Sequence, residues 1–285
     1  VRGNVIPAYM KWFADRCDMV LAPSAGMRQV IKDYGTETSI EVFPTGLTEE
    51  FYEKNISRSA QIRQKFGNGR KHLLVTVSRL EKEKNYGFLL RGIAEVRRKI
   101  GDDFQVLIIG DGRQMAELKV RASLLGIQDA VTFLGNIPNH EVKDYLNAAD
   151  LFLFASRSET QGIVLAEAMA AGNPVAAVHA TGVDDIVRDG VNGFLTEEDE
   201  EAWADRVIEA LDETVRRRMA AEAVSTAEDY RSSRLARYEE MLYNQCVCRK
   251  REERRAKGHA LSTDRKEERL YEEENRREHS AVGIR

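Results

Sequence analysis

The chain has 285 residues, a formal net charge of −4 and 32% charged side chains, which excludes nucleic-acid binding through a bulk basic surface. Its three cysteines are too few for a disulfide framework and fit a reducing, cytoplasmic setting. No apolar run is long enough to span a bilayer, no signal peptide is visible, and the length favours two domains or one domain with an appendage.

Residues 1–46 alternate between helix and strand patterns. An amphipathic helix is predicted over 4–16, and a second helix, with Ser24 as its N-cap, follows the apolar run 19–23. A further strand is predicted over 40–43. Because two or three strands do not form a stable sheet alone, we expect 1–46 to be the end of a truncated N-terminal α/β domain. Packing as an accessory onto the following domain is the alternative.

After a polar linker predicted over 47–70, six apolar runs indicate strands. They are 72–77, 104–109, 131–134, 151–155, 174–178 and 193–195. Helices are predicted between them over 86–100, over 113–125, over 139–148 with Asn139 as the cap, after Gly162, and near 183–188. Continuous apolar strands are typical of parallel sheets that helices cover on both faces. The fold class is therefore α/β, a doubly wound, Rossmann-like parallel sheet over 71–198 with its ligand crevice at the carboxyl ends of the strands.

The rest of the chain is predicted to be helical and increasingly polar. Residues 199–245 carry two apolar stripes at helical spacing, the first containing Trp203 and the second Leu242. From Cys246 onward the composition is Arg, Lys and Glu, which predicts a solvated helix or disorder over 246–285. A partner site in this tail is the alternative. Its two cysteines are too few for a zinc site by themselves.

The stretch from 156 to 172 has the most unusual pattern in the chain. The predicted helix after Gly162 is apolar on nearly every face, so it should be buried. Glu167 is the single carboxylate in it, and a buried charge should have a fixed polar partner. Glu159 lies at or before the helix start, where backbone N–H groups are unpaired. Two carboxylates around exposed amides suit a ligand with sugar hydroxyls and phosphate oxygens; a core helix with one internally bonded Glu is the alternative.

Loops at other strand ends offer complementary groups. Arg79 and Lys84 follow the first strand of the sheet and could hold a diphosphate, Arg by bidentate hydrogen bonds and Lys as a point charge. Lys82 is interpreted as surface charge. The turn containing Gly110 and Asp111 resembles half of a dinucleotide fingerprint, which is a weak signal alone. His179 is interpreted as a surface histidine rather than a base.

Four motifs occur in an order that resembles a known family. They are Ser78-Arg79-Leu80 with Lys84-Asn85, Ile109-Gly110-Asp111-Gly112, Phe133-Leu134-Gly135, and Glu159 through Glu167. Over residues 18 to about 243 the sequence resembles the nucleotide-sugar half of the retaining "group 1" glycosyltransferases, which have the two-Rossmann GT-B architecture. The resemblance implies transfer of a hexose, with retention at the anomeric carbon, from a nucleotide-diphosphate sugar.

The resemblance also implies residue roles. Arg79 and Lys84 would hold the donor diphosphate, Glu159 would lie beside the transferred sugar, and Glu167 would accept the ribose hydroxyls. The remaining donor contacts would come from Gly110, Asp111, Phe133, Leu134, Gly135, Gln161, Gly162 and Ile163, with Phe133 to Gly135 bordering the nucleobase. A UDP-sugar is expected rather than a GDP-sugar, and no cofactor is expected. No metal ion is expected either, because no Asp-x-Asp motif or His cluster is present.

The acceptor side is weakly defined. The chain opens on Val1 without a methionine, and only the end of the family's N-terminal domain is recognisable, so a module that binds donor without turnover is the alternative function. The segment from Arg2 to Tyr34 and the sequence Glu159-Thr160-Gln161-Gly162 resemble glycosyltransferases that glucosylate diacylglycerol. The helix over 4–16 could touch an anionic membrane; burial of Trp12 in the absent part of the domain is the alternative. A retaining glycosidase ranks lower, because phosphate-binding cations flank the two carboxylates.

Overall fold

The computed structural model describes residues 5–281 and places side chains for residues 6–256. It divides into two compact units, Val1–Ala236 and Arg237–Arg285. The start of the predicted first helix, the first three residues of the Arg2 to Tyr34 resemblance, and the last four residues of the charged tail lie outside the described residues.

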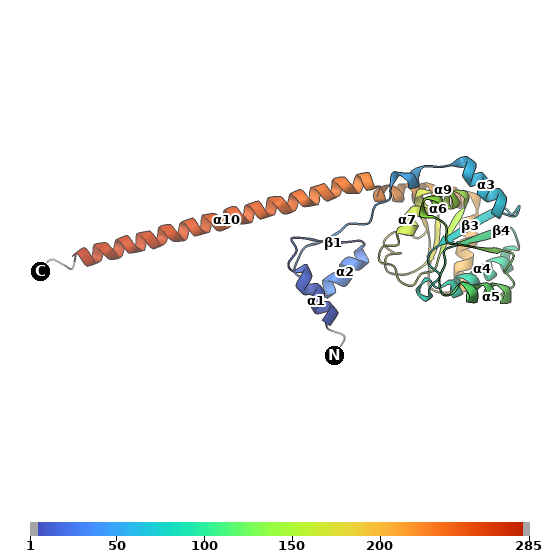
Figure 1. Cartoon of the computed structure of the whole chain (residues 1–285), viewed down its shortest axis with the longest axis horizontal. Helices are drawn as coiled ribbons and strands as arrows, with labels where there is room; N and C mark the ends of the chain where they lie inside the picture. The colour runs from blue at the N-terminus through green and yellow to red at the C-terminus, as the bar shows by residue number, and fades with distance from the viewer. Residues whose placement is uncertain (1–4, 282–285) are drawn as a thin grey trace. The chain divides into compact units, whose positions relative to one another are not determined.

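A six-stranded, fully parallel sheet forms the centre of the first unit (Figure 1). Its spatial order is β5-β4-β3-β6-β7-β8. The strands are β3 (His72–Val77), β4 (Phe104–Ile109), β5 (Val131–Gly135), β6 (Leu151–Phe154), β7 (Val175–Val178) and β8 (Gly193–Thr196). The predicted doubly wound parallel sheet is confirmed. The chain winds outward from β3 in one direction and returns to the other side at β6, so the topological switch point lies between these two strands.

Helices cover both faces of the sheet, as the continuous apolar strands predict. One core contains side chains of α4 (Tyr86–Ile100), α5 (Met115–Leu124) and α8 (Glu200–Leu211). The other contains side chains of α3 (Ile56–Phe66), α6 (Asn139–Ala148), α7 (Ile163–Ala170) and the end of α9 (Glu213–Ala227). Neighbouring residues of one strand enter opposite cores, Leu73 with α6 and α7 and Leu74 with α4.

The contact of α4 with α8 depends on a glycine. A Cβ atom at Gly92 would lie 2.6 Å from Trp203 Cε3, and Trp203 is fully buried. Gly92→Ala is therefore expected to lower the free energy of unfolding by about 1–3 kcal/mol through overpacking, although alanine favours helix. Urea unfolding would measure this. Gly87→Ala in the same helix is the matched control, because its Cβ would meet the flexible guanidinium groups of Arg121 and Arg91. An equal loss in both variants would contradict the packing explanation.

The N-terminal piece, within the first unit, has a separate two-stranded sheet. It contains α1 (Val5–Ala14), β1 (Val20–Ala22), α2 (Ala25–Asp33) and β2 (Ile40–Val42), and β1 pairs with β2 in parallel. The predicted cap is confirmed, because the Ser24 hydroxyl accepts a hydrogen bond from the Met27 N–H at 3.2 Å. On α1 the large apolar side chains are exposed, Trp12 and Phe13 among them.

Three local predictions differ from the structure. The segment predicted as a linker contains a short 3-10 helix, η1 (Glu49–Tyr52), and α3, which lies on the sheet domain with Ile62 in the core. No helix forms near 183–188, where the chain makes successive turns after Gly182, which has a positive φ of 78°. Asn139 is the first residue of α6 rather than its cap, and Pro138 occupies the cap position.

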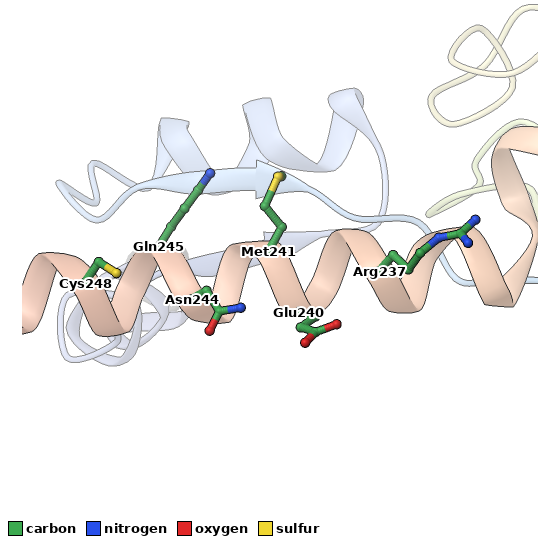
Figure 2. A pocket seen from close by; sticks show the side chains of 6 residues that line it. All are labelled: Arg237, Glu240, Met241, Asn244, Gln245 and Cys248. Carbon is green, nitrogen blue, oxygen red and sulfur yellow. The ribbon is translucent and has the colours of Figure 1, made fainter.

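The last helix, α10 (Ser232–Ala281), begins in the first unit and forms the second (Figure 1). A pocket of about 450 Å³ lies along one face of it (Figure 2). The residues that line this pocket are Arg237, Glu240, Met241, Asn244, Gln245 and Cys248. The tail was predicted to be either a helix or disordered. Its backbone is helical through residue 281. Among the described residues, no helix is both long and apolar enough to cross a membrane.

Candidate functional site

The loops that follow β3 and β6 meet at the switch point of the sheet. Their backbones are joined directly, because the Arg157 N–H donates to the Glu83 carbonyl at 2.9 Å. The Ser156 hydroxyl donates to the same carbonyl at 3.3 Å. The two loops therefore form one surface, although more than 70 residues separate them in the sequence.

Lys84 and Glu159 form an ion pair across these two loops. Lys84 Nζ lies 2.5 Å from Glu159 Oε1, and the two side chains are 14% and 15% exposed. Limited exposure makes such a pair stronger than a surface pair, and it makes the loss of either partner costly. The structure thus brings together two of the residues that the sequence predicts for the site.

Arg79 lies on the open side of the same loop. Its side chain is 76% exposed, and its nearest carboxylate is that of Glu83, at 3.5 Å. An exposed pair at this distance contributes little and is easily exchanged. Arg79 is thus free to reorient toward a ligand, whereas Lys84 is already held in place.

The loop after β6 ends at the first turn of α7. Gly162 caps this helix with a positive φ of 74°, a conformation that favours glycine, and it is buried. A Cβ atom at Gly182 would lie 2.7 Å from the Glu159 carbonyl oxygen, so the turn after β7 packs closely against the same loop. The Glu159 N–H also donates to the Thr181 carbonyl at 3.2 Å. The amides of the first turn, including that of Ile163, begin at this point.

Glu167 lies in the middle of α7 without a partner. Among the described residues, no hydrogen bond or ion pair reaches its carboxylate, and desolvation alone raises the pKa of Glu167 to about 7. The alternative of an internally bonded core glutamate is therefore wrong, whereas the fixed polar partner, which the resemblance assigns to ribose hydroxyls, stays a prediction. A carboxyl group that is largely buried, unpaired and shifted in pKa is a candidate for a functional position.

Gln161 is engaged with the N-terminal piece rather than left free. The Thr45 N–H donates to Gln161 Oε1 at 2.8 Å, and Gln161 Nε2 donates to the Thr45 carbonyl at 3.2 Å. Any donor contact from Gln161 would then come chiefly from its backbone. Its assignment as a donor-binding residue stays a prediction.

The glycine turn after β4 serves contact between loops. A Cβ atom at Gly110 would lie 1.9 Å from the Ser78 carbonyl oxygen, and one at Gly112 would lie 2.5 Å from that of Leu80. The Asp111 carbonyl accepts a hydrogen bond from the Leu80 N–H at 2.9 Å. These glycines bring the turn against the backbone of the loop that carries Arg79, which is a structural reason for the motif independent of any ligand.

The segment Phe133 to Gly135 ends the edge strand β5. The side chains of Phe133 and Leu134 contact opposite cores of the sheet. The Gly135 carbonyl accepts a hydrogen bond from the Gly110 N–H at 2.8 Å, which places this strand end beside the turn after β4. Its predicted role at the nucleobase is not tested by these contacts.

His179 and Lys82, which were interpreted from the sequence as surface residues, are both exposed. His179 lies 3.1 Å from the Asp184 carboxylate, measured from its Nδ1 atom. Within the described part of the chain, no group of three or more His, Cys, Asp or Glu side chains could hold a metal ion.

Sequence reasoning missed the contribution of the N-terminal piece to this loop. The Ser24 hydroxyl donates to the Thr160 carbonyl at 2.8 Å, and the Gly26 N–H donates to the Asp185 carboxylate at 3.0 Å. These contacts join residues more than 130 positions apart, and no local pattern in the sequence signals them. Only the helix cap at Ser24 was recognisable.

Comparison with known proteins gives a consistent relationship. Residues 57–226 match the family model described as "Glycosyl transferases group 1". The alpha-monoglucosyldiacylglycerol synthase of Streptococcus pneumoniae is 33% identical over 200 residues, which is 68% of this chain and 45% of that protein. The D-inositol 3-phosphate glycosyltransferase of Nocardia farcinica is 34% identical over 223 residues, which is 75% of this chain and 49% of that protein. The chain thus spans about half the length of these relatives.

Solved structures share the fold. The crystal structure of Anabaena Alr3699/HepE in complex with UDP has a TM-score of 0.77 at 24% identity and covers 85% of this chain and 68% of its own. The complex of the same protein with UDP and glucose gives a TM-score of 0.75 over the same shares of the two chains. At this identity the likeness concerns the fold alone.

Proposed function

We propose, from the premise that this chain belongs to the group 1 glycosyl transferases, that its six-stranded domain binds a nucleotide-diphosphate sugar and takes part in transfer of the sugar with retention. The observation that carries this proposal is the ion pair of Lys84 and Glu159 at the switch point of the sheet, together with the unpaired carboxyl group of Glu167 in the helix that follows Glu159. One cation can hold a diphosphate there, one carboxylate can face a sugar, and one unpaired carboxylate can accept ribose hydroxyls.

The proposed chemistry gives the cations the largest role. The bond between the anomeric carbon and the donor phosphate oxygen breaks, a bond to the acceptor oxygen forms on the same face of the sugar, and the proton of the acceptor hydroxyl passes to the leaving diphosphate. The leaving diphosphate gains negative charge as this bond breaks, and preorganised positive groups stabilise that charge. Lys84, Arg79 and the first amides of α7, at Gly162 and Ile163, are the groups proposed for this. No metal ion is part of the proposal.

We also propose a class of donor and a class of acceptor. A UDP-sugar is favoured, because the Anabaena protein of the same fold was solved with UDP. A lipid acceptor of the diacylglycerol type is favoured by the Streptococcus relative, whose name states such an activity. The exposed aromatic side chains of α1, with the guanidinium of Arg16 lying 3.9 Å from the centre of the Trp12 ring, support contact with an anionic membrane surface.

Calorimetry tests the proposal. UDP, GDP and UDP-glucose would be titrated into the full chain, and binding of UDP in the micromolar to millimolar range is expected. Absence of binding at millimolar UDP and GDP would contradict the proposal. Assays of donor hydrolysis, and of transfer to diacylglycerol, then separate an enzyme from a module that binds the donor without turnover.

Arg79→Ala is expected to weaken UDP binding about tenfold and uridine binding by less than about twofold, because a charge-assisted bond to phosphate is lost. Calorimetry with the two ligands measures both losses. Lys82→Ala is the matched control, since it removes a positive charge from the same loop at an exposed position outside the site. Equal losses of UDP and uridine affinity in the Arg79 variant would mean a structural role for this side chain.

A further inference from the structure

The loop that carries Glu159 is attached to the N-terminal piece by a pair of hydrogen bonds. The Gln161 carboxamide accepts from the Thr45 N–H at 2.8 Å and donates to the Thr45 carbonyl at 3.2 Å. This pairing, here called the amide clasp, imitates the exchange of hydrogen bonds between two strands. Gln161 is 8% exposed whereas Thr45 is exposed, so both bonds are partly buried. Because the Thr45 N–H can only donate, the orientation of the amide is determined by its partner.

The clasp joins two parts of the chain with separate sheets. Thr45 lies on the connection between β2 and η1, and its side chain is exposed, so only its main chain takes part. Gln161 lies between Glu159 and Gly162, the cap of α7. A shift of the connection relative to the six-stranded sheet would therefore be transmitted to the loop that carries Glu159.

Contacts other than the clasp also hold this loop in place. The Ser24 hydroxyl, which is buried, donates to the Thr160 carbonyl from the N-terminal side. On the other side Gly182 approaches the Glu159 carbonyl so closely that a Cβ atom would not fit. The side chain of Gln161 supplies a further tie, at the residue between the sugar-facing carboxylate and the helix start.

We infer that Gln161 is a positioning residue, which holds the loop from Glu159 to Gly162 against the N-terminal piece in the arrangement that contacts the donor sugar. Its action is indirect, through the main chain of Thr45, because both ends of its carboxamide are already paired. The effect on sugar binding rests on the proposed function, whereas the clasp itself can be tested without ligand.

The first test measures amide hydrogen exchange by NMR in the full chain. In Gln161→Leu, which keeps the volume and removes both bonds, exchange of the Thr45 amide is expected to accelerate about tenfold or more. The Leu47 amide, which donates to the Tyr230 carbonyl at 2.7 Å, is the internal control and should keep its rate. An unchanged rate at Thr45 would overturn the inference.

The second test compares two ligands by calorimetry. In Gln161→Leu the Kd of UDP is expected to stay within about twofold, while the ratio of the UDP-glucose Kd to the UDP Kd rises about tenfold. Simple destabilisation would not change this ratio. Equal weakening of both ligands would overturn the inference, because it would indicate a direct contact with the nucleotide.

Thr45→Ala is the matched control for the second test. It removes the exposed side chain and keeps the N–H and carbonyl of the clasp, so the ratio of the two Kd values should not change. A rise equal to that of Gln161→Leu would overturn the main-chain mechanism. Failure of the unaltered chain to bind UDP would contradict the proposed function, and the exchange rate at Thr45 would still decide whether the clasp exists in solution.

Discussion

Glu159→Gln is expected to strengthen UDP binding about tenfold while it lowers the stability of the free protein by about 2 kcal/mol. The physical cause is the ion pair with Lys84, whose ammonium lies 2.5 Å from the carboxylate in a largely buried position. A diphosphate that binds Lys84 must compete with Glu159 and also approaches its negative charge. Glutamine removes both obstacles and keeps the shape of the side chain.

The stability change follows from the same pair. In the variant, Lys84 keeps its charge in a site where 14% of its side chain is exposed, and it loses its partner. UDP would supply a new partner, so the rise in melting temperature on addition of UDP should be larger in Glu159→Gln than in the unaltered chain. Calorimetry and thermal unfolding with and without UDP measure the two effects.

Glu83→Gln is the control for the effect of charge alone. Glu83 lies next to Lys84 in the sequence and 3.5 Å from Arg79, but both members of that pair are exposed. Its replacement removes one negative charge near the same loop and should change UDP affinity by less than about threefold. Weaker UDP binding in Glu159→Gln would contradict the competition and would assign Glu159 a direct role in nucleotide binding.

The parts of the fold that could be predicted are those with a continuous pattern. The inner strands of the six-stranded sheet are buried on both faces, so their apolar runs stand out from the flanking loops. The helix α3 could not be found in this way, because only Ile62 of its residues is buried, Phe66 is partly buried and most of its other residues are polar. The helix predicted near 183–188 does not form, because the positive φ of Gly182 turns the chain there.

The candidate site was predictable where topology alone determines proximity. Lys84 and Glu159 follow the two strands that flank the switch point, and the rule that ligands bind there predicts that such loops converge. The clasp between Gln161 and Thr45 depends instead on how two separate sheets are placed. No residue type at either position indicates a bond across 116 residues. No partner for Glu167 is present among the described side chains, and a pKa raised to about 7 lowers the cost of leaving this carboxyl group unpaired.

Glu167→Gln is expected to make the free protein more stable at pH 8 by up to about 3 kcal/mol and to leave its stability nearly unchanged at pH 4. Burial raises the pKa of Glu167 to about 7 from its ordinary value of 4.5. Between these two values the folded state keeps a proton that the unfolded state has released, so stability falls as pH rises from 4.5 to 7. Above pH 7 the loss is complete and constant.

Urea unfolding of the unaltered chain and the variant from pH 4 to pH 8 measures this difference. Glu228→Gln provides a control of opposite sign, because its hydrogen bond with Arg231 lowers the pKa of Glu228, so its replacement removes stability at neutral pH. A stability difference in Glu167→Gln that does not change with pH would contradict an ionisable, unpaired carboxyl group at this position.

The same carboxyl group connects stability with ligand binding. Ribose hydroxyls that donate to Glu167 would favour its ionised form, so nucleoside binding should release a proton when the pH is below about 7. Calorimetric titration with uridine, which has no phosphate, in two buffers of different ionisation enthalpy would detect this proton in the unaltered chain and not in Glu167→Gln. The variant should also bind uridine about tenfold more weakly at pH 8, because a charged acceptor is lost. If Glu167→Gln is more stable but binds uridine with unchanged affinity, the carboxylate does not contact the ribose. The ribose assignment would then be wrong.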